Sequence, residues 1–369
     1  MKRIRFVLPL MAALALAGCE SKMLVGVVLP ETGEVSAYGT SIKAAVKLAF
    51  DDAIAAKKLP PNLVVVYKDS GSNPTRAADE AEALYRDGAL LVLGGATSPE
   101  AKAMLRVAER HGRVLLSPSA SLPELAKIGG WFFRVYPSDD LEGATAASFM
   151  ATAWKARSVL VVQEDVPYTE GLLPVFTADL GKLGGHVVMT VKTSDPSWRK
   201  QLQAALAKLR PQAVYLCGYA EGIVSALKEI RGSGYAGGVC TTSAICSAEV
   251  LGQAGPVVDG VFFPRVSVDL GSTEEPIRSF ATRYRELTGH GADVYAAHGY
   301  DAALVAIHAF EDPSVRSAAL MRARIRALAD KRGVTGPLDF DDLGNVSRRL
   351  QIHQILGGKP VVWQAPAAS

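Results

Sequence analysis

The chain has 369 residues, of which 49% are hydrophobic and 21% charged, with 40 Lys and Arg against 37 Asp and Glu. At roughly 150 residues per domain this length suggests about two domains, and the near-average composition excludes disordered, collagen-like and disulfide-scaffold classes. Lys2, Arg3 and Arg5 precede Cys19 and no acid does, so the chain from Cys19 onward has 37 basic and 37 acidic residues. A chain without net positive charge or a Lys/Arg-rich block is a poor candidate for binding nucleic acid.

The N-terminus has the pattern of a secretory signal. Basic residues at 2–5 precede an uncharged apolar stretch over 6–17, which is shorter than the roughly 20 residues that a membrane-spanning helix needs. The stretch ends Leu-Ala-Gly-Cys19, which resembles the bacterial lipobox. That resemblance implies removal of a signal peptide, residues 1–18, and a lipidated tether over 19–23 that holds the protein at a membrane surface. An ordinary signal peptide followed by a chance cysteine is the alternative.

Three further cysteines are Cys217, Cys240 and Cys246. In an oxidising compartment one pair can form a disulfide, and Cys217 and Cys240 end two successive expected strands. Buried free thiols are the alternative. The spacing of the three matches no metal site.

From residue 24 the chain alternates short Val/Leu/Ile-rich runs with amphipathic stretches. The runs predict strands over 24–29, 63–68, 90–93, 114–117, 159–162, 187–190, 213–216 and 239–241. The amphipathic stretches predict helices over 41–56, 75–87, 101–111, 143–154, 169–182, 199–208 and 223–232. Nearly continuous apolar strands separated by helices favour parallel sheets that are covered on both faces.

This alternation is too long for one doubly wound sheet, and its rhythm changes near Tyr136-Pro137-Ser138 and near Phe263-Pro264. We therefore expect an α/β fold with two doubly wound parallel-sheet lobes joined by a hinge that the chain crosses several times. The expected first lobe is 24–137 with 265–336, and the expected second lobe is 138–264 with 337–369. After Pro264 we expect helices over 277–287, 294–310 and 317–329, a turn-rich stretch over 336–345, and strands over 350–356 and 361–363. Two hinged lobes imply a cleft.

Ligands of open α/β sheets bind beyond the carboxyl ends of the strands, and hydroxyl groups gather there. The third strand leads to Ser98, expected as a helix N-cap, with Pro99 at the first helical position. The fourth strand leads through Ser119 to Ser121, again before an expected helix. Helix N-termini with hydroxyl groups suit a carboxylate, although capping alone is the alternative explanation for Ser98 and Ser121.

The second expected lobe presents Tyr168 and Tyr219 after its own strands. A tyrosine at a strand end lines a pocket and donates one hydrogen bond, or packs half-buried without contacting a ligand.

A series of short motifs runs through nearly the whole chain after residue 24. It comprises Pro30-Glu31-Thr32-Gly33 with Tyr38-Gly39, Lys68-Asp69-Ser70 with Asn73-Pro74, Gly94 to Ser98, Ser117 to Ser121, Arg134 with Ser138-Asp139, Tyr168 to Gly171, Gly218-Tyr219, and Gly336 to Asp341 with Gly344. In order and spacing the series resembles the leucine/isoleucine/valine-binding protein family, the type I periplasmic binding proteins of ABC importers. The resemblance implies the type I periplasmic binding protein fold.

The resemblance also implies how a ligand is held. In this family one lobe grips the ligand carboxylate through a serine hydroxyl and backbone N–H groups, and tyrosines of the other lobe close over it. The corresponding positions here are Tyr38, Thr97, Ser98, Ser119, Ala120, Ser121, Tyr168 and Tyr219.

One departure from the family concerns the ligand ammonium. The family's amino-acid binders have an acid after the strand that matches 239–241, whereas this chain reads Thr242-Ser243-Ala244 there. Burying an unpaired ammonium is costly. Either Glu221 or Asp139 supplies the missing charge, or the ligand lacks a cation and Ser243 makes only a hydrogen bond.

Several enzyme motifs are missing from the sequence, which has no Gly-x-Ser-x-Gly, no Walker loop and no His-Glu-x-x-His. We therefore expect a non-enzymatic, extracytoplasmic solute-binding lipoprotein without metal or cofactor. Its expected ligand is a small polar or zwitterionic solute, an amino acid or a related amide or carboxylate, and its expected partners are ABC permease and ATPase subunits. A ligand sensor or regulatory lipoprotein that acts on an envelope partner is the alternative.

Overall fold

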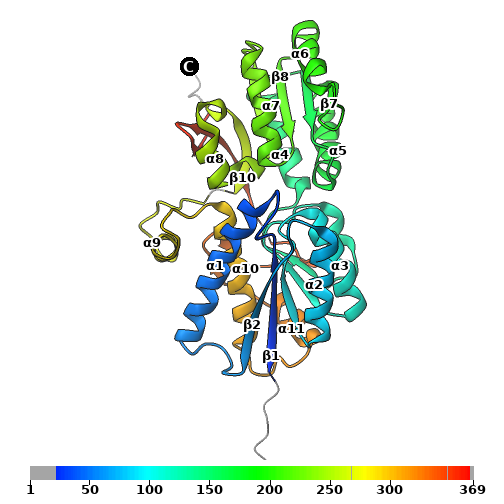
Figure 1. The fold of residues 1–369 in the computed structure, drawn as a ribbon. Helices are drawn as coiled ribbons and strands as arrows, with labels where there is room; N and C mark the ends of the chain where they lie inside the picture. Colours follow the sequence, from blue (N-terminus) through cyan, green and yellow to red (C-terminus); the bar gives the residue numbers. More distant parts are fainter. Residues whose placement is uncertain (1–21, 267, 347, 366–369) are drawn as a thin grey trace, which may run out of the picture.

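The computed structural model describes residues 22–365 except 267 and 347, and it contains two lobes (Figure 1). The expected signal peptide and Cys19 lie outside the described residues. The first lobe is built on a sheet of order β2-β1-β3-β4-β5 in which all neighbouring strands are parallel. Its strands are β1 (Met23–Leu29), β2 (Leu63–Asp69), β3 (Leu91–Gly94), β4 (Val114–Ser117) and β5 (Phe132–Arg134).

Helices cover both faces of this sheet. They are α1 (Ser36–Ala55), α2 (Pro74–Arg86), α3 (Ser98–His111), α10 (Val294–Phe310) and α11 (Ala318–Arg326), and a further helix, α9 (Ile277–Thr288), packs against α1. Val92 and Leu115 pack under α2 and α3, whereas Leu91 and Leu93 face the core shared with α1, α10 and α11. Alternate side chains of one strand point to opposite faces, which is why apolar residues run without interruption along β3 and β4.

The second lobe is built on a sheet of order β14-β13-β10-β9-β8-β6-β7. Its strands are β6 (Ser158–Gln163), β7 (His186–Lys192), β8 (Ala213–Cys217), β9 (Gly238–Thr241), β10 (Phe262–Val266), β13 (Leu350–Leu356) and β14 (Lys359–Val362), and its helices are α4 (Asp139–Thr152), α5 (Pro167–Lys182), α6 (Trp198–Leu209), α7 (Ala220–Gly232) and α8 (Ala248–Ala254). The expected parallel pairing runs from β7 to β10, and β13 and β14 add an antiparallel edge.

Strand β10 lies where we expected the chain to leave the second lobe. Pro264 has no N–H to donate, so a proline inside a sheet is tolerated only where that donor is not needed. The ladder between β10 and β9 consists of one pair, Phe262 with Cys240, and Pro264 pairs with Ile352 of the antiparallel strand on the other side. The chain therefore leaves the second lobe after β10 and not at Pro264.

Three crossings join the lobes in the described chain: after β5, after β10 and before β13 (Figure 1). Two of them are tied together at Arg134. Its backbone N–H donates to the carbonyl of Gly344 at 2.9 Å, its carbonyl accepts from Val346, and its Nε donates to Asn345 at 2.7 Å. Gly344, which ends the series of sequence motifs, thus lies in the hinge.

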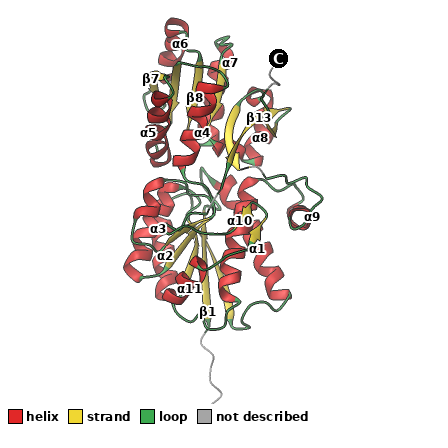
Figure 2. Cartoon of the chain, turned by 180° about the vertical axis from the view of Figure 1, so that it is seen from behind, coloured by secondary structure: helices red, strands yellow, loops and turns green. Residues whose placement is uncertain are grey.

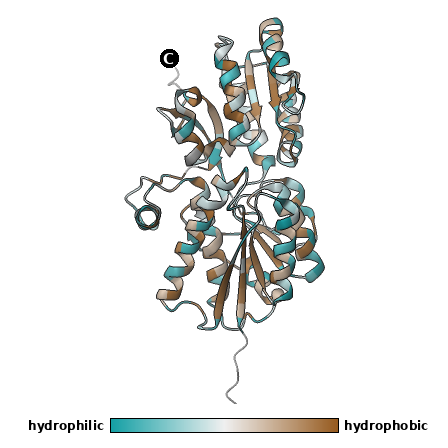
Figure 3. Ribbon diagram, viewed as in Figure 1, coloured by the Kyte–Doolittle hydropathy of each residue, from teal (hydrophilic) through white to brown (hydrophobic). Residues whose placement is uncertain are grey.

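Both lobes bury apolar strands beneath amphipathic helices, as the hydropathy colouring and the reverse view show (Figures 2 and 3). Central strands β3, β4 and β8 are buried along their whole length. Between residues 22 and 365, none of the described helices combines the length and apolarity needed to cross a bilayer.

Candidate ligand-binding site

A pocket lies between the lobes, where strand ends and helix starts of both meet. Its empty volume is about 370 Å³, which includes the open space at its mouth. Its lining residues are Tyr38, Ala96, Thr97, Ser98, Ser119, Ser121, Tyr136, Tyr168, Tyr219, Ser243, Ala244 and Tyr295. Eight of the expected site residues therefore line this one pocket.

The loop after β3 presents Thr97 and Ser98. The expected cap at Ser98 is wrong by one position, because Thr97 is the N-cap of α3 and Glu100 accepts hydrogen bonds from its N–H and hydroxyl at 3.4 and 3.2 Å. A Thr-x-x-Glu capping box of this kind fixes the helix start. The Ser98 hydroxyl instead accepts a hydrogen bond from the N–H of Leu122 at 3.3 Å, so its own proton is available to a ligand.

The loop after β4 presents Ser119 and Ser121. Ser117 holds this loop by donating to the carbonyl of Gly95 at 2.9 Å. Ser119 donates its hydroxyl proton to the carbonyl of Ala96 at 2.6 Å, so toward a ligand it acts as an acceptor. Ser121 does not cap the following short 3-10 helix, Pro123–Lys127, whose N-cap is Leu122.

Tyr38 connects the two lobes. Its hydroxyl donates to the carbonyl of Ala244 at 3.2 Å and accepts from the N–H of Ala220 at 3.1 Å. Gly39 allows the neighbouring loop to approach, since a Cβ at Gly39 would lie 1.9 Å from the carbonyl oxygen of Pro30. The Pro-x-Thr-Gly and Tyr-Gly motifs thus pack on each other and position this tyrosine.

The second lobe supplies a stacked tyrosine pair, Tyr168 and Tyr219, with ring centroids 5.6 Å apart. The N–H of Tyr219 donates to Glu164 at 2.7 Å, and Gly218 leaves room for that carboxylate, because a Cβ there would lie 2.7 Å from it. Burial raises the pKa of Tyr168 and Tyr219, so both phenols stay protonated and are able to donate hydrogen bonds.

Sequence reasoning missed Tyr136 and Tyr295, which also line the pocket. The hydroxyl of Tyr136 lies 2.7 Å from that of Ser243, and the hydroxyl of Tyr295 donates to the carbonyl of Ser243 at 3.3 Å. Tyr136 follows β5 and Tyr295 begins α10, so a systematic search of residues at strand ends and helix starts would have found both.

Glu142 is a second omission, and it lies directly behind the lining. Its carboxylate accepts from the N–H of Ser243 at 2.6 Å, from the Ser243 hydroxyl at 3.0 Å and from the Tyr168 hydroxyl at 3.4 Å. Burial raises the pKa of Glu142 to about 7 in spite of these donors. Its sequence signal was the spacing of three from Asp139, which places both acids on one helix face.

Three expected site residues do not line the pocket. Asp139 is fully buried behind it, Ala120 packs in the core of the first lobe, and Glu221 is exposed in the first turn of α7. Burial raises the pKa of Asp139, an effect strengthened by Glu142 and opposed by Ser121 and Arg134. Glu221 therefore does not take the place of the missing acid at Thr242–Ala244. The structure has Cys217, Cys240 and Cys246 as buried free thiols.

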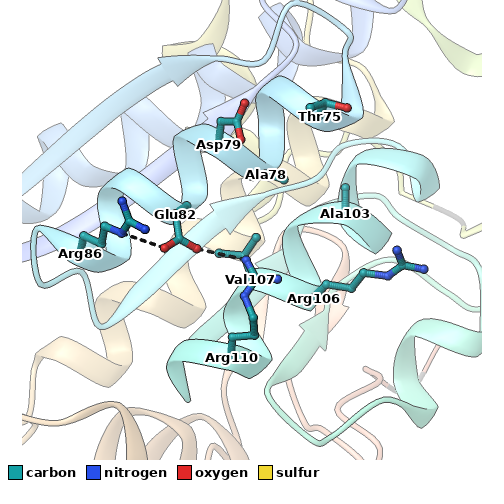
Figure 4. A pocket seen from close by; sticks show the side chains of 9 residues that line it. All are labelled: Thr75, Ala78, Asp79, Glu82, Arg86, Ala103, Arg106, Val107 and Arg110. Atoms are coloured by element: carbon teal, nitrogen blue, oxygen red, sulfur yellow. Dashed lines mark hydrogen bonds and ion pairs between the residues drawn. The ribbon is translucent and has the colours of Figure 1, made fainter.

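A second depression lies between α2 and α3 on the outer surface of the first lobe (Figure 4). It is lined by Thr75, Ala78, Asp79, Glu82, Arg86, Ala103, Arg106, Val107 and Arg110. Glu82 already pairs with Arg86, Arg110 and His111 at 2.8–3.2 Å. Glu82, Arg86 and Arg110 are thus engaged with one another, and the pocket between the lobes remains the candidate site.

The chain is similar in sequence and in fold to known proteins. A leucine-, isoleucine-, valine-, threonine- and alanine-binding protein of Pseudomonas aeruginosa is 23% identical over 350 residues, 91% of this chain and 92% of the relative. The fold is similar to the leucine-binding protein LivK of Thermotoga maritima, with a TM-score of 0.85, 24% identity and coverage of 93% and 98% of the two chains. It is also similar to a solute-binding protein of Rhodopseudomonas palustris solved in complex with benzoate, with a TM-score of 0.83, 21% identity and coverage of 94% and 98%.

The family model described as "Periplasmic binding protein" matches residues 23–359, which include every residue of the pocket. This match covers most of the chain, and the protein belongs to the periplasmic binding protein family.

Proposed function

We propose that this protein is the solute-binding component of an ABC importer and that it captures a small amino-acid-like solute between its lobes. The pocket carries the proposal: serine hydroxyls of the first lobe and tyrosines and Ser243 of the second line one pocket between the lobes. Ser98 has a proton to donate to a carboxylate and Ser119 has an oxygen to accept from an N–H group. Relatives named for branched-chain amino acids support this class of solute.

Closure of the lobes is the proposed signal of occupancy. A ligand shifts the equilibrium between open and closed forms only through its preference for one of them. A solute held by Ser98 on one lobe and Tyr219 on the other prefers the closed form, and the permease then recognises the closed surface. We further propose that lipid on Cys19 anchors the protein on the periplasmic side of a membrane.

A thermal-shift screen of amino acids, amides and small carboxylates tests solute capture, because a tight ligand raises the melting temperature by mass action. Hits are then measured by calorimetry, and uptake of the labelled hit is compared in cells with and without the gene. We expect a melting-temperature rise and loss of uptake upon deletion. A hit whose uptake is unaffected by deletion would favour a sensor or regulator over a transport component. Metabolic labelling with a fatty acid, compared between the full chain and Cys19→Ala, tests the anchor.

A further inference from the structure

Two buried acids lie together at the start of α4, behind the pocket. Asp139 and Glu142 are 0% and 3% exposed. Glu142 is hydrogen-bonded to the lining residues Ser243 and Tyr168. Asp139 lies beside the lining residue Ser121, whose hydroxyl favours its charged form, yet neither of its carboxyl oxygens makes a hydrogen bond of good geometry in the described chain. Buried carboxylates that are only partly satisfied are costly.

Within the described residues, no cation acts on Glu142 and only Arg134 acts on Asp139. Neither carboxylate forms an ion pair with a Lys, Arg or His there. Arg134 favours the charged form of Asp139 and makes its hydrogen bonds to Asn345 and to the carbonyl of Leu122, so it offsets at most one of the two carboxylate charges. Two neighbouring buried carboxyl groups of like charge disfavour ionisation. With both acids ionised, the pair would therefore carry one negative charge that no cation of the described residues offsets.

The other titratable groups around Glu142 do not supply a positive charge. The phenols of Tyr136, Tyr168, Tyr215 and Tyr295 interact with it, and burial raises the pKa of each, so all are neutral. Burial likewise raises the pKa of the thiols of Cys217, Cys240 and Cys246. Arg265 acts on Tyr136 and Cys246. It is not among the groups that act on Glu142.

The position of Glu142 indicates that a ligand in the pocket supplies the cation that this acid lacks. The segment Thr242–Ala244 carries no acid, but the N–H and hydroxyl of Ser243 both donate to Glu142, which reaches the same place from α4. We infer that Glu142, supported by Asp139, forms an anionic subsite that binds a cationic group of the ligand, such as the ammonium of an amino acid. This inference rests on the proposed function and narrows its solute from polar molecules in general to those with a cation.

The test uses matched probes that differ only in the amine: leucine with 4-methylpentanoate, valine with 3-methylbutanoate, and phenylalanine with 3-phenylpropanoate, together with benzoate. Binding is measured by calorimetry near neutral pH for the wild-type protein, Glu142→Gln and Asp139→Asn. Glu170→Gln is the matched control, because Glu170 is an exposed acid in the first turn of α5. The melting temperature of each unliganded variant verifies that it is folded.

We expect the wild-type protein to bind at least one amine-bearing probe at least about 30-fold more tightly than its partner, the range of a charge-assisted hydrogen bond. Glu142→Gln should weaken that probe at least tenfold and change its amine-free partner less than threefold, and Glu170→Gln should change neither. Binding heats in phosphate and Tris should also differ by the proton that the ammonium displaces from Glu142, and this difference should vanish in Glu142→Gln.

Three results would contradict the inference. Equal or tighter wild-type binding of an amine-free acid or benzoate would remove the cation subsite and leave solute capture intact. Unchanged affinity of the amine-bearing probe in folded Glu142→Gln would remove the assignment to this residue. Wild-type binding of none of the probes would count against the proposed function and, with it, against this inference.

Discussion

The phenolic oxygen of Tyr38 lies 3.1 Å from the backbone nitrogen of Ala220, and this hydrogen bond joins the first lobe to the second. The same hydroxyl donates to the carbonyl of Ala244. Tyr38 is in the first turn of α1, and its two partners belong to the segments after β8 and β9. Both bonds need the lobes to be in contact, so they belong to the closed form.

Replacing Tyr38 with Phe should weaken ligand binding about tenfold. The substitution removes two hydrogen bonds of about 1 kcal/mol each, and some of that loss is recovered by water in the open form. Calorimetry measures the affinity, and stopped-flow fluorescence should show that faster dissociation accounts for most of the change. Tyr67→Phe is the control, since Tyr67 is a half-buried residue of β2 outside the pocket. An unchanged dissociation rate in Tyr38→Phe would contradict a role in closure.

Replacing Ser98 and Ser121 together with Ala should weaken any carboxylate ligand at least tenfold. A hydroxyl that donates to a carboxylate contributes about 1.5–3 kcal/mol, and both residues line the pocket on the first lobe. Titration of the best hit from the thermal-shift screen measures the effect. Ser148→Ala, on the exposed face of α4, serves as the control. Unaltered affinity in the double variant would remove these residues from the carboxylate site.

Gly39→Ala should destabilise the protein by about 2 kcal/mol or more. The new Cβ would overlap the carbonyl oxygen of Pro30, and relief requires the loop or α1 to move. Urea unfolding measures the stability, and the displaced Tyr38 should also weaken ligand binding. Gly181→Ala is the matched control, because Gly181 is a helical glycine with nothing within 4 Å of its added Cβ. It should be neutral or stabilising by up to about 1 kcal/mol.

Glu142 should make the protein less stable as the pH rises from about 4.5 toward 7. Its pKa is raised from 4.5 to about 7 by burial, so the folded state binds the proton more tightly than the unfolded state. The stabilising contribution is complete below pH 4.5 and is lost as the pH passes the folded-state value. At about 1.4 kcal/mol per pKa unit the whole effect is at most about 3.5 kcal/mol.

Comparison of the wild-type protein with Glu142→Gln isolates this contribution. Burial lowers the pKa of His298 to about 3, so His298 has the opposite effect: its contribution to stability is lost as the pH falls below 6.5. The difference in free energy of unfolding between the two proteins, measured in urea at several pH values, cancels the histidine term. We expect the variant to gain relative stability between pH 5 and 7. A pH-independent difference would show that Glu142 does not titrate in this range.

Local sequence features were sufficient to predict much of this molecule. Runs such as 90–93 and 114–117 are apolar over their whole length, and only a strand buried on both faces tolerates that, so their carboxyl ends and the hydroxyls after them could be located. Ser98, Ser121, Tyr168 and Tyr219 were found in this way. The choice between Thr97 and Ser98 as the cap depended on Glu100 and required the capping-box spacing to be applied.

The remaining parts of the site depend on contacts between distant segments. Tyr136 and Tyr295 are 159 positions apart, and their rings are 6.3 Å from each other because the chain returns from the second lobe to the first before α10. Glu142 resembles an ordinary surface acid in the sequence until Ser243, about 100 positions later, packs against it. Pro264 appeared to end a lobe, and it was tolerated within β10 because its neighbour β9 pairs only at Phe262.

The bonds from Tyr38 to Ala220 and Ala244 have protein groups at both ends. They contribute to closure whether or not a solute is present, so some empty molecules will adopt the closed shape. In the proposed importer, a permease that sensed shape alone would then trigger ATP hydrolysis by the ATPase subunits without moving a solute. Transport that does not waste ATP therefore requires the bound solute to stabilise the closed form more than the hydrogen bonds of Tyr38 do.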